Sequence, residues 1–208
     1  MPIADTITPF EPHVPDNELD DLYARLTTVR WPDPETVEDT GQGPQSNRIK
    51  ALVERWQRDY DWRACEKMIN DLGSYRTEID GLGIHFLHIR SPEPDALPVV
   101  ITHGWPGSVR EFRDTISPLT DPVAHSGNAE DAFHLVLPTL PGFGWSDKPT
   151  EPDWNIGRIA GAWVELMQRL GYERWVAQGG DFGASATTAL GYMQPESLAG
   201  VHLNMGMF

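Results

Sequence analysis

The apolar residues of the first 73 positions recur at the spacing of helices. Residues 33–46 are rich in Pro, Gly, Asp and Thr, and this composition predicts a loop between two helices. A third helix is expected to begin near Asp61 and to stop at Gly73. The apolar positions that share one face in the first two helices are Leu19, Leu22, Tyr23, Leu26 and Val29, then Ile49, Leu52, Val53, Trp56 and Tyr60. Residues 1–73 are therefore predicted to form a helical N-terminal meander.

From residue 74 onward, short apolar runs alternate with amphipathic segments. Residues 75–80 and 84–89 flank Gly81 and Gly83, a pattern that predicts an antiparallel hairpin. Further strands are expected at about 98–102, 133–137, 174–178 and 199–204, with helices at about 108–120, 155–170 and 182–193. Strands and helices in alternation are typical of an α/β fold with a mostly parallel sheet and crossover helices. Residues 74–208 are therefore predicted to form a second domain of this class.

Composition narrows the environment and the partners. The formal net charge of −15 argues against nucleic acid or an anionic membrane surface as a partner. A single cysteine, Cys65, leaves no internal disulfide, and no signal peptide or run of about 20 apolar residues is found, so we expect a cytoplasmic protein. The histidines lack the spacing of metal ligands, and no phosphate-binding glycine loop is present. We therefore expect neither a metal nor a cofactor.

Asp181 is the strongest candidate for chemistry. The apolar run from Trp175 leads into Gly179-Gly180-Asp181-Phe182-Gly183, after which small residues open a helix. This is the pattern of the nucleophile elbow of α/β hydrolases, with Asp in the place that Ser takes in the usual version. A carboxylate at that position can attack a saturated carbon and form an ester, which water then hydrolyses. The alternative is an Asp that only caps the following helix.

A second motif supports the elbow. The apolar run that begins at Pro98 ends in His103-Gly104-Trp105-Pro106-Gly107, and Ser108 to Glu111 form a capping box at the start of a helix. In the α/β-hydrolase fold the oxyanion hole uses the backbone N–H after the nucleophile and one from the loop after the third strand. We therefore expect the N–H groups of Phe182 and Trp105 to form it. Pro106 is expected to fix the turn, with a cis Trp105–Pro106 bond as one option.

At this point the chain resembles the microsomal type of epoxide hydrolase. The resemblance rests on His103-Gly-Trp-Pro-Gly-Ser108, Leu140-Pro-Gly-Phe-Gly-Trp-Ser146 and Gly179-Gly-Asp-Phe-Gly183, together with the segments 24–32 and 75–86. It covers essentially the whole sequence. The resemblance implies the N-terminal half of an α/β-hydrolase core, with a meander that wraps the core and braces a lid. The lid and the C-terminal half of the core are expected to be absent.

The resemblance also implies a function, the opening of a small apolar epoxide to a vicinal diol by water. Asp181 would form the alkyl ester, and Trp105, Phe143, Trp145 and Phe182 would form an aromatic wall for the substrate. The family's catalytic His, its acid and two lid tyrosines are expected beyond Phe208, because Glu196 and His202 lie too close to the elbow. We interpret His202 as a packed strand residue. The chain alone is expected to be inactive and to need a complementary C-terminal half, with a homo-oligomer as another possible assembly.

Other functions remain open. Haloalkane dehalogenases share the Asp elbow and the His-Gly-x-Pro loop, but they typically hold the halide with an indole N–H that Phe182 does not offer. Esterase activity is disfavoured because Ser185 lies off the elbow. A third reading is a non-catalytic remnant that binds apolar ligands or a partner through an open face. Restored diol formation on adding a complementary half would separate the enzyme from the remnant.

Overall fold

A computed structural model describes residues 6–206, which divide into two compact units. The smaller unit is His13–Met68, and the rest of the described chain forms the larger one. The expected boundary at residue 73 therefore shifts: residues 6–12 and 69–73 belong with the sheet, since Thr8 and Pro9 pair with the strand that begins at Ser74.

The smaller unit is helical, as predicted. It contains α1 (Asp16–Thr27), α2 (Ser46–Asp59) and most of α3 (Trp62–Asp71). Buried Glu66 ties the segment before α1 to α3, because its carboxylate accepts the N–H of Val14 at 2.6 Å and the indole N–H of Trp62 at 2.8 Å. Ile49, Leu52, Trp56 and Tyr60 on α2 remain exposed.

The larger unit is a seven-stranded mixed sheet in the order β1-β2-β3-β5-β4-β6-β7. β1, β2, β3 and β5 pair antiparallel in that order, whereas β5, β4, β6 and β7 are parallel, which confirms the predicted α/β class. The strands are β1 (Thr8–Pro9), β2 (Ser74–Ile79), β3 (Leu82–Ile89), β4 (Leu97–Thr102), β5 (Phe133–Pro138), β6 (Trp175–Gly179) and β7 (Leu198–Leu203).

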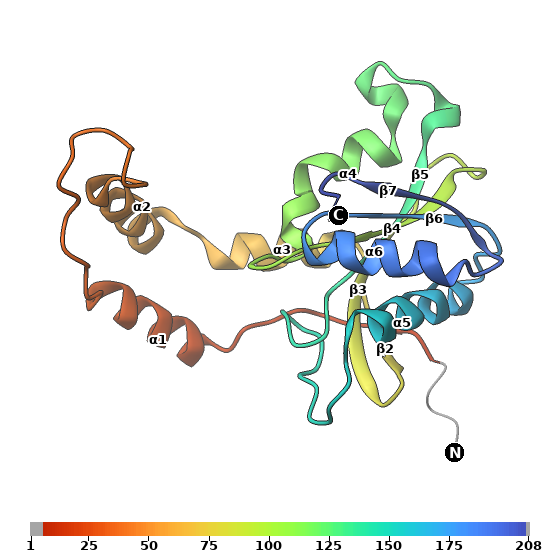
Figure 1. The fold of residues 1–208 in the computed structure, drawn as a ribbon, viewed down its shortest axis with the longest axis horizontal. Helices are drawn as coiled ribbons and strands as arrows, with labels where there is room; N and C mark the ends of the chain where they lie inside the picture. Colours follow the sequence, from red (N-terminus) through yellow and green to blue (C-terminus); the bar gives the residue numbers. More distant parts are fainter. Residues whose placement is uncertain (1–5, 207–208) are drawn as a thin grey trace. The chain divides into compact units, whose positions relative to one another are not determined.

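The helices of the larger unit lie on both sides of this sheet (Figure 1). A short 3₁₀ helix (Val109–Phe112) leads into α4 (Arg113–Thr120) on one face, and α5 (Ile156–Arg169) and α6 (Phe182–Met193) cover the other. Right-handed crossovers explain why α4 and α6 lie on opposite faces of the sheet. The connection from β4 to β5 runs in one direction along the sheet, and the connection from β6 to β7 runs in the other. The main core lies between the sheet and α5 and α6, with Trp163, Met167 and Trp175 fully buried.

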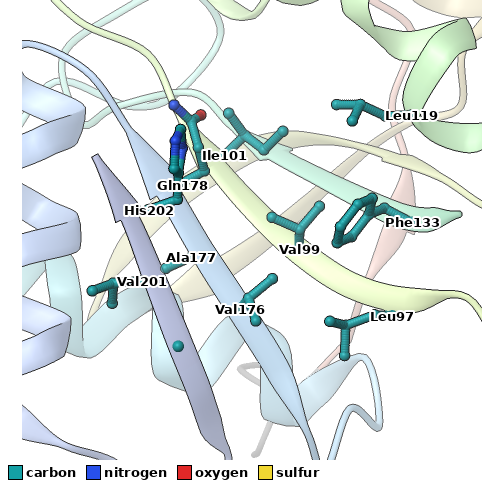
Figure 2. A pocket seen from close by; sticks show the side chains of 11 residues that line it. Leu97, Val99, Ile101, Leu119, Phe133, Val176, Ala177, Gln178, Val201 and His202 are labelled. Atoms are coloured by element: carbon teal, nitrogen blue, oxygen red, sulfur yellow. The ribbon is translucent and has the colours of Figure 1, made fainter. Parts of the chain in front are cut away.

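One sheet face is left partly uncovered beside α4. A hollow of about 360 Å³ lies there, floored by apolar residues of β4, β6 and β7. Figure 2 shows Val99 and Ile101 of β4 on the same side as Leu119, with Gln178 and His202 at one end of the hollow. Parallel strands are usually buried on both faces, so this exposure is unusual for them.

Candidate active site

The candidate site lies where two neighbouring parallel strands send their chains to opposite faces. After β4 the chain turns toward α4, and after the adjacent β6 it turns toward α6. In open α/β sheets such a switch point leaves a crevice at the carboxyl ends of the strands, and ligands bind there. Trp105 follows β4 and Asp181 follows β6, so both candidate residues come to this crevice.

The backbone of Asp181 has the strained geometry of a nucleophile elbow. Its φ of 52° and ψ of −127° lie in a region that non-glycine residues rarely adopt. Strand and helix pass so closely that a Cβ on Gly179 would lie 2.1 Å from the carbonyl oxygen of Gly183. Small residues are therefore needed around the bend.

The side chain of Asp181 is held by two backbone amides. Its Oδ1 accepts the N–H of Trp105 at 2.8 Å and the N–H of Phe182 at 2.7 Å. These are the two donors that the sequence indicates for an oxyanion hole. An ordinary N-cap accepts from the second or third helical residue, whereas Oδ1 reaches across to the loop after β4. No described residue donates a hydrogen bond to Oδ2, and Asp181 lines the hollow in this crevice.

Electrostatics keep this carboxyl ionised. The hydrogen bond from the Trp105 amide, and then that from Phe182, hold the pKa of Asp181 below its ordinary value, while partial desolvation opposes them. A carboxylate, and not a carboxylic acid, is therefore present at neutral pH, as a nucleophile requires.

The loop after β4 fits closely over Asp181. A Cβ on Gly104 would lie 2.5 Å from the Cβ of Asp181, so only glycine lets this loop approach. The Trp105–Pro106 bond is cis, which bears out that option for the turn. The Ser108–Glu111 capping box is also present, but it opens the 3₁₀ helix before α4.

A polar hollow of about 540 Å³ opens beside Asp181. Its walls include Glu111, Gln178 and Asn204, none of which the sequence assigned to the site. Asn204 directly follows β7, and its amide oxygen packs where a Cβ on Gly180 would lie. The position of Asn204 could have been predicted from the sequence, because it ends a predicted strand and the carboxyl ends of parallel strands meet at one edge of the sheet.

The four aromatic residues expected to form a wall do not lie together. Phe143 and Phe182 line a second, apolar hollow of about 360 Å³ with Trp154, Ile156 and Ile159. Trp105 is 64% exposed and lines the polar hollow. Trp145 lines neither hollow, and its ring instead packs edge-on against His85 at 5.4 Å between centroids.

Histidines do not gather at Asp181. His202 lies on β7 with an exposed side chain at the open sheet face, so it is not the packed residue that the sequence indicated. Within residues 6–206, no group of three His, Cys, Asp or Glu side chains could hold a metal ion.

Comparison with known proteins identifies the family. Residues 7–112 match the family described as epoxide hydrolase N terminus, and residues 98–207 match the alpha/beta hydrolase fold family. The chain belongs to the epoxide hydrolase family. A relative from Stigmatella aurantiaca whose name places it among epoxide hydrolases is 61% identical over 95% of this chain and 45% of its own length. Epoxide hydrolase 1 of Oryctolagus cuniculus is 33% identical over 98% of this chain and 46% of its own length.

Solved epoxide hydrolase structures have the same fold. The Aspergillus niger epoxide hydrolase matches at 32% identity with a TM-score of 0.84, over 99% of this chain and 54% of that one. The juvenile hormone epoxide hydrolase of Bombyx mori matches at 32% identity with a TM-score of 0.83, over 96% and 53%. The chain thus spans about half the length of the epoxide hydrolases it matches. In the described residues, none of the helices has the length and apolar character needed to cross a membrane.

Proposed function

We propose that this chain is the N-terminal part of an epoxide hydrolase in which Asp181 is the nucleophile. The observation that carries the proposal is the asymmetry of its carboxylate, with Oδ1 held by two amides and Oδ2 without a hydrogen-bond donor among the described residues, in a residue that lines the hollow. Oδ2 attacks an epoxide carbon, the ring C–O bond breaks, and its electron pair stays on the epoxide oxygen, which takes up a proton. The product of this step is an alkyl ester of Asp181.

Hydrolysis of that ester uses the same two amides. Water adds to the ester carbonyl carbon, and the negative charge develops on Oδ1, which already lies 2.8 Å from the Trp105 nitrogen and 2.7 Å from that of Phe182. Such preorganised donors contribute about 3–4 kcal/mol each in other enzymes. Collapse of the intermediate releases the diol and restores the carboxylate, with an oxygen from water in place of Oδ2.

The groups that protonate the epoxide oxygen and activate the water are proposed to come from a complementary C-terminal half. His202 is the one histidine that follows Asp181 in the sequence, and it lines the open sheet face and not the hollow beside Asp181. In the chain alone, solvent water would have to protonate the epoxide oxygen, and the reaction is expected to stop at the ester. The lone Cys65 fits a reducing compartment such as the cytoplasm.

The apolar hollow behind Phe182 supports an apolar substituent on the epoxide. Phe143, Trp154 and Phe182 line it, and the Phe182 amide donates to Asp181, so the hollow adjoins the nucleophile. Phe182 offers a phenyl ring where dehalogenases offer an indole N–H, and this disfavours halide release as the chemistry.

The ester is the species to detect. We expect the chain incubated with styrene oxide to gain the mass of one epoxide, located by peptide mass spectrometry at residue 181. Asp181→Asn keeps the shape but removes the nucleophilic oxygen, so it should gain none. Addition at other residues only, or equal addition in the variant, would contradict the proposal.

Oxygen transfer gives a second test once the complementary half is added. In ¹⁸O-labelled water, the diol from the first turnover should contain no label, because its new oxygen comes from Oδ2 of Asp181. Immediate label in the diol would show direct attack by water on the epoxide and would exclude the ester route.

A further inference from the structure

His103 lies between two loops of the site. It directly follows β4 and is 1% exposed. Its ring Nε2 accepts the backbone N–H of Leu140 at 3.1 Å, and its Nδ1 lies 3.0 Å from the carbonyl oxygen of Gly104. One side chain therefore joins the loop that bears Trp105 to the loop that bears Leu140 and Phe143.

These two contacts fix one form of the ring. A backbone amide can only donate and a carbonyl can only accept, so Nε2 must be unprotonated and Nδ1 must carry the hydrogen. Burial lowers the pKa of His103, although the Gly104 carbonyl and the charge of Glu111 oppose the shift. With both nitrogens occupied inside the protein, this ring is not available as the base that activates water.

The contact with Gly104 reaches the nucleophile through a single peptide group. The carbonyl that accepts from His103 and the N–H of Trp105 that donates to Asp181 belong to the same peptide unit. Because a peptide is planar, fixing its oxygen fixes the direction of its N–H. A hydrogen bond at the oxygen also polarises the peptide and strengthens its N–H as a donor.

We propose that His103, held as the neutral Nδ1–H form, is a positioning residue that aims the Trp105 amide at Asp181 and keeps the Leu140 loop beside it. The effect of His103 on the formation and hydrolysis of the ester rests on the proposed function of Asp181. The orientation of the Gly104–Trp105 peptide, in contrast, is a property of the folded chain and can be measured without any substrate.

The test is nuclear magnetic resonance on the 208-residue chain. At neutral pH the ring of His103 should show a protonated Nδ1 and an unprotonated Nε2. The ¹³C titration of the Asp181 carboxyl then reports on its amide donors. In His103→Leu, the pKa of Asp181 should rise by about one unit, because a fixed backbone N–H donor lowers the pKa of a carboxylate by roughly that amount and its loss removes the effect.

Two variants separate positioning from general destabilisation. His103→Asn keeps a side-chain N–H for the Gly104 carbonyl and should retain most of the low pKa of Asp181. His88→Gln alters a half-buried histidine, which contacts Tyr172, and should leave the titration of Asp181 unchanged. If His103→Leu does not fold, the form of the native ring decides, because a neutral ring protonated at Nε2 has no hydrogen on Nδ1 to donate to the Gly104 carbonyl.

The contradicting results are specific. A folded His103→Leu chain with an unchanged Asp181 titration, or a native ring protonated at Nε2, would overturn the positioning role. If all the spectra agree and styrene oxide still adds nothing at residue 181, then the proposed function fails and the role of His103 in the fold stands.

Discussion

At the scale of single residues, Gly104 is the position where one added methyl group acts directly on the candidate nucleophile. A Cβ there would lie 2.8 Å from Oδ1 and 2.9 Å from Cγ of Asp181. We expect Gly104→Ala to displace the carboxylate from its position for attack and to slow ester formation by about 100-fold, the effect that a displacement of a reacting group by about 1 Å can have. The rate of mass gain with styrene oxide measures it.

Gly161 provides the matched control. It lies within α5, and a Cβ added there meets nothing within 4 Å. Gly161→Ala should leave the rate of ester formation unchanged and raise the free energy of unfolding by about 0.5–1 kcal/mol, because alanine favours the helix. Equal losses of rate in both variants would show that the rate responds to a glycine-to-alanine change in general and not to the contact between Gly104 and Asp181.

His85 should make stability depend on pH. It is fully buried between Ser74 and Thr139, and burial, followed by the charge of Arg76, lowers its pKa from 6.5 to about 4. The unfolded chain then binds a proton near pH 6.5 that the folded chain takes up only near pH 4. The stabilisation is complete above pH 6.5 and is lost as the pH falls to 4, by about 3 kcal/mol.

Urea unfolding at several pH values checks this dependence. The free energy of unfolding of the native chain should fall more steeply between pH 6.5 and 4 than that of His85→Gln, in which no ring titrates. Parallel curves for the two proteins would show that His85 does not contribute the expected loss.

The sequence located the candidate nucleophile and the two amides that bind it, because glycines and a lone acid at the end of an apolar strand carry a strong local signal. Other features of the site could not be predicted in this way. In a sequence, a lone histidine after a strand is typical of a core residue. The hydrogen bond from the Leu140 N–H to His103 could therefore not be predicted without coordinates. Trp145 illustrates the reverse, since an aromatic residue in a glycine-rich loop can turn toward His85 and away from the site.

At the scale of elements, the start of α5 depends on one cap. Asn155 accepts the backbone N–H of Arg158 at 3.1 Å, and Gly171 follows the helix with a φ of +80°. We expect Asn155→Ala to lower the free energy of unfolding by about 1 kcal/mol, whereas Asn155→Asp should lower it by much less. Thermal unfolding of the two variants compares them, and an equal loss in both would contradict the capping role.

Element types were predictable from periodicity, but their ends were not. The hairpin turns at Asp80 and Gly81, both with positive φ, so Gly83 lies within β3 and not in the turn as expected. The capping box at Ser108 marks a helix start without fixing its pitch, and the first turn is 3₁₀. β1 has only two residues, Thr8 and Pro9, too few for a periodic signal.

At the scale of the whole molecule, the open sheet face should bind apolar dyes. Its hollow of about 360 Å³ is floored by residues such as Val99 and Val176. We expect 8-anilinonaphthalene-1-sulfonate to fluoresce with the folded chain, and Gly200→Asp to reduce the signal several-fold. A Cβ at Gly200 meets only Val176 at 3.9 Å, so the new carboxylate fits without strain.

The control for the dye places the same charge elsewhere. Gly161→Asp adds a carboxylate on α5, away from the open face, and should leave the fluorescence unchanged. If both variants reduce the signal equally, the dye responds to net charge, which is already −15, and not to the hollow.

The uncovered face also bears on the heat capacity of the protein. Apolar surface that is already wet in the folded state adds nothing to the heat-capacity increase on unfolding, which averages about 12–15 cal/mol/K per residue in globular proteins. The strand side chains that line the hollow are wet in this way. The stability of the chain should therefore vary less steeply with temperature than its length alone implies, with a flatter and broader maximum.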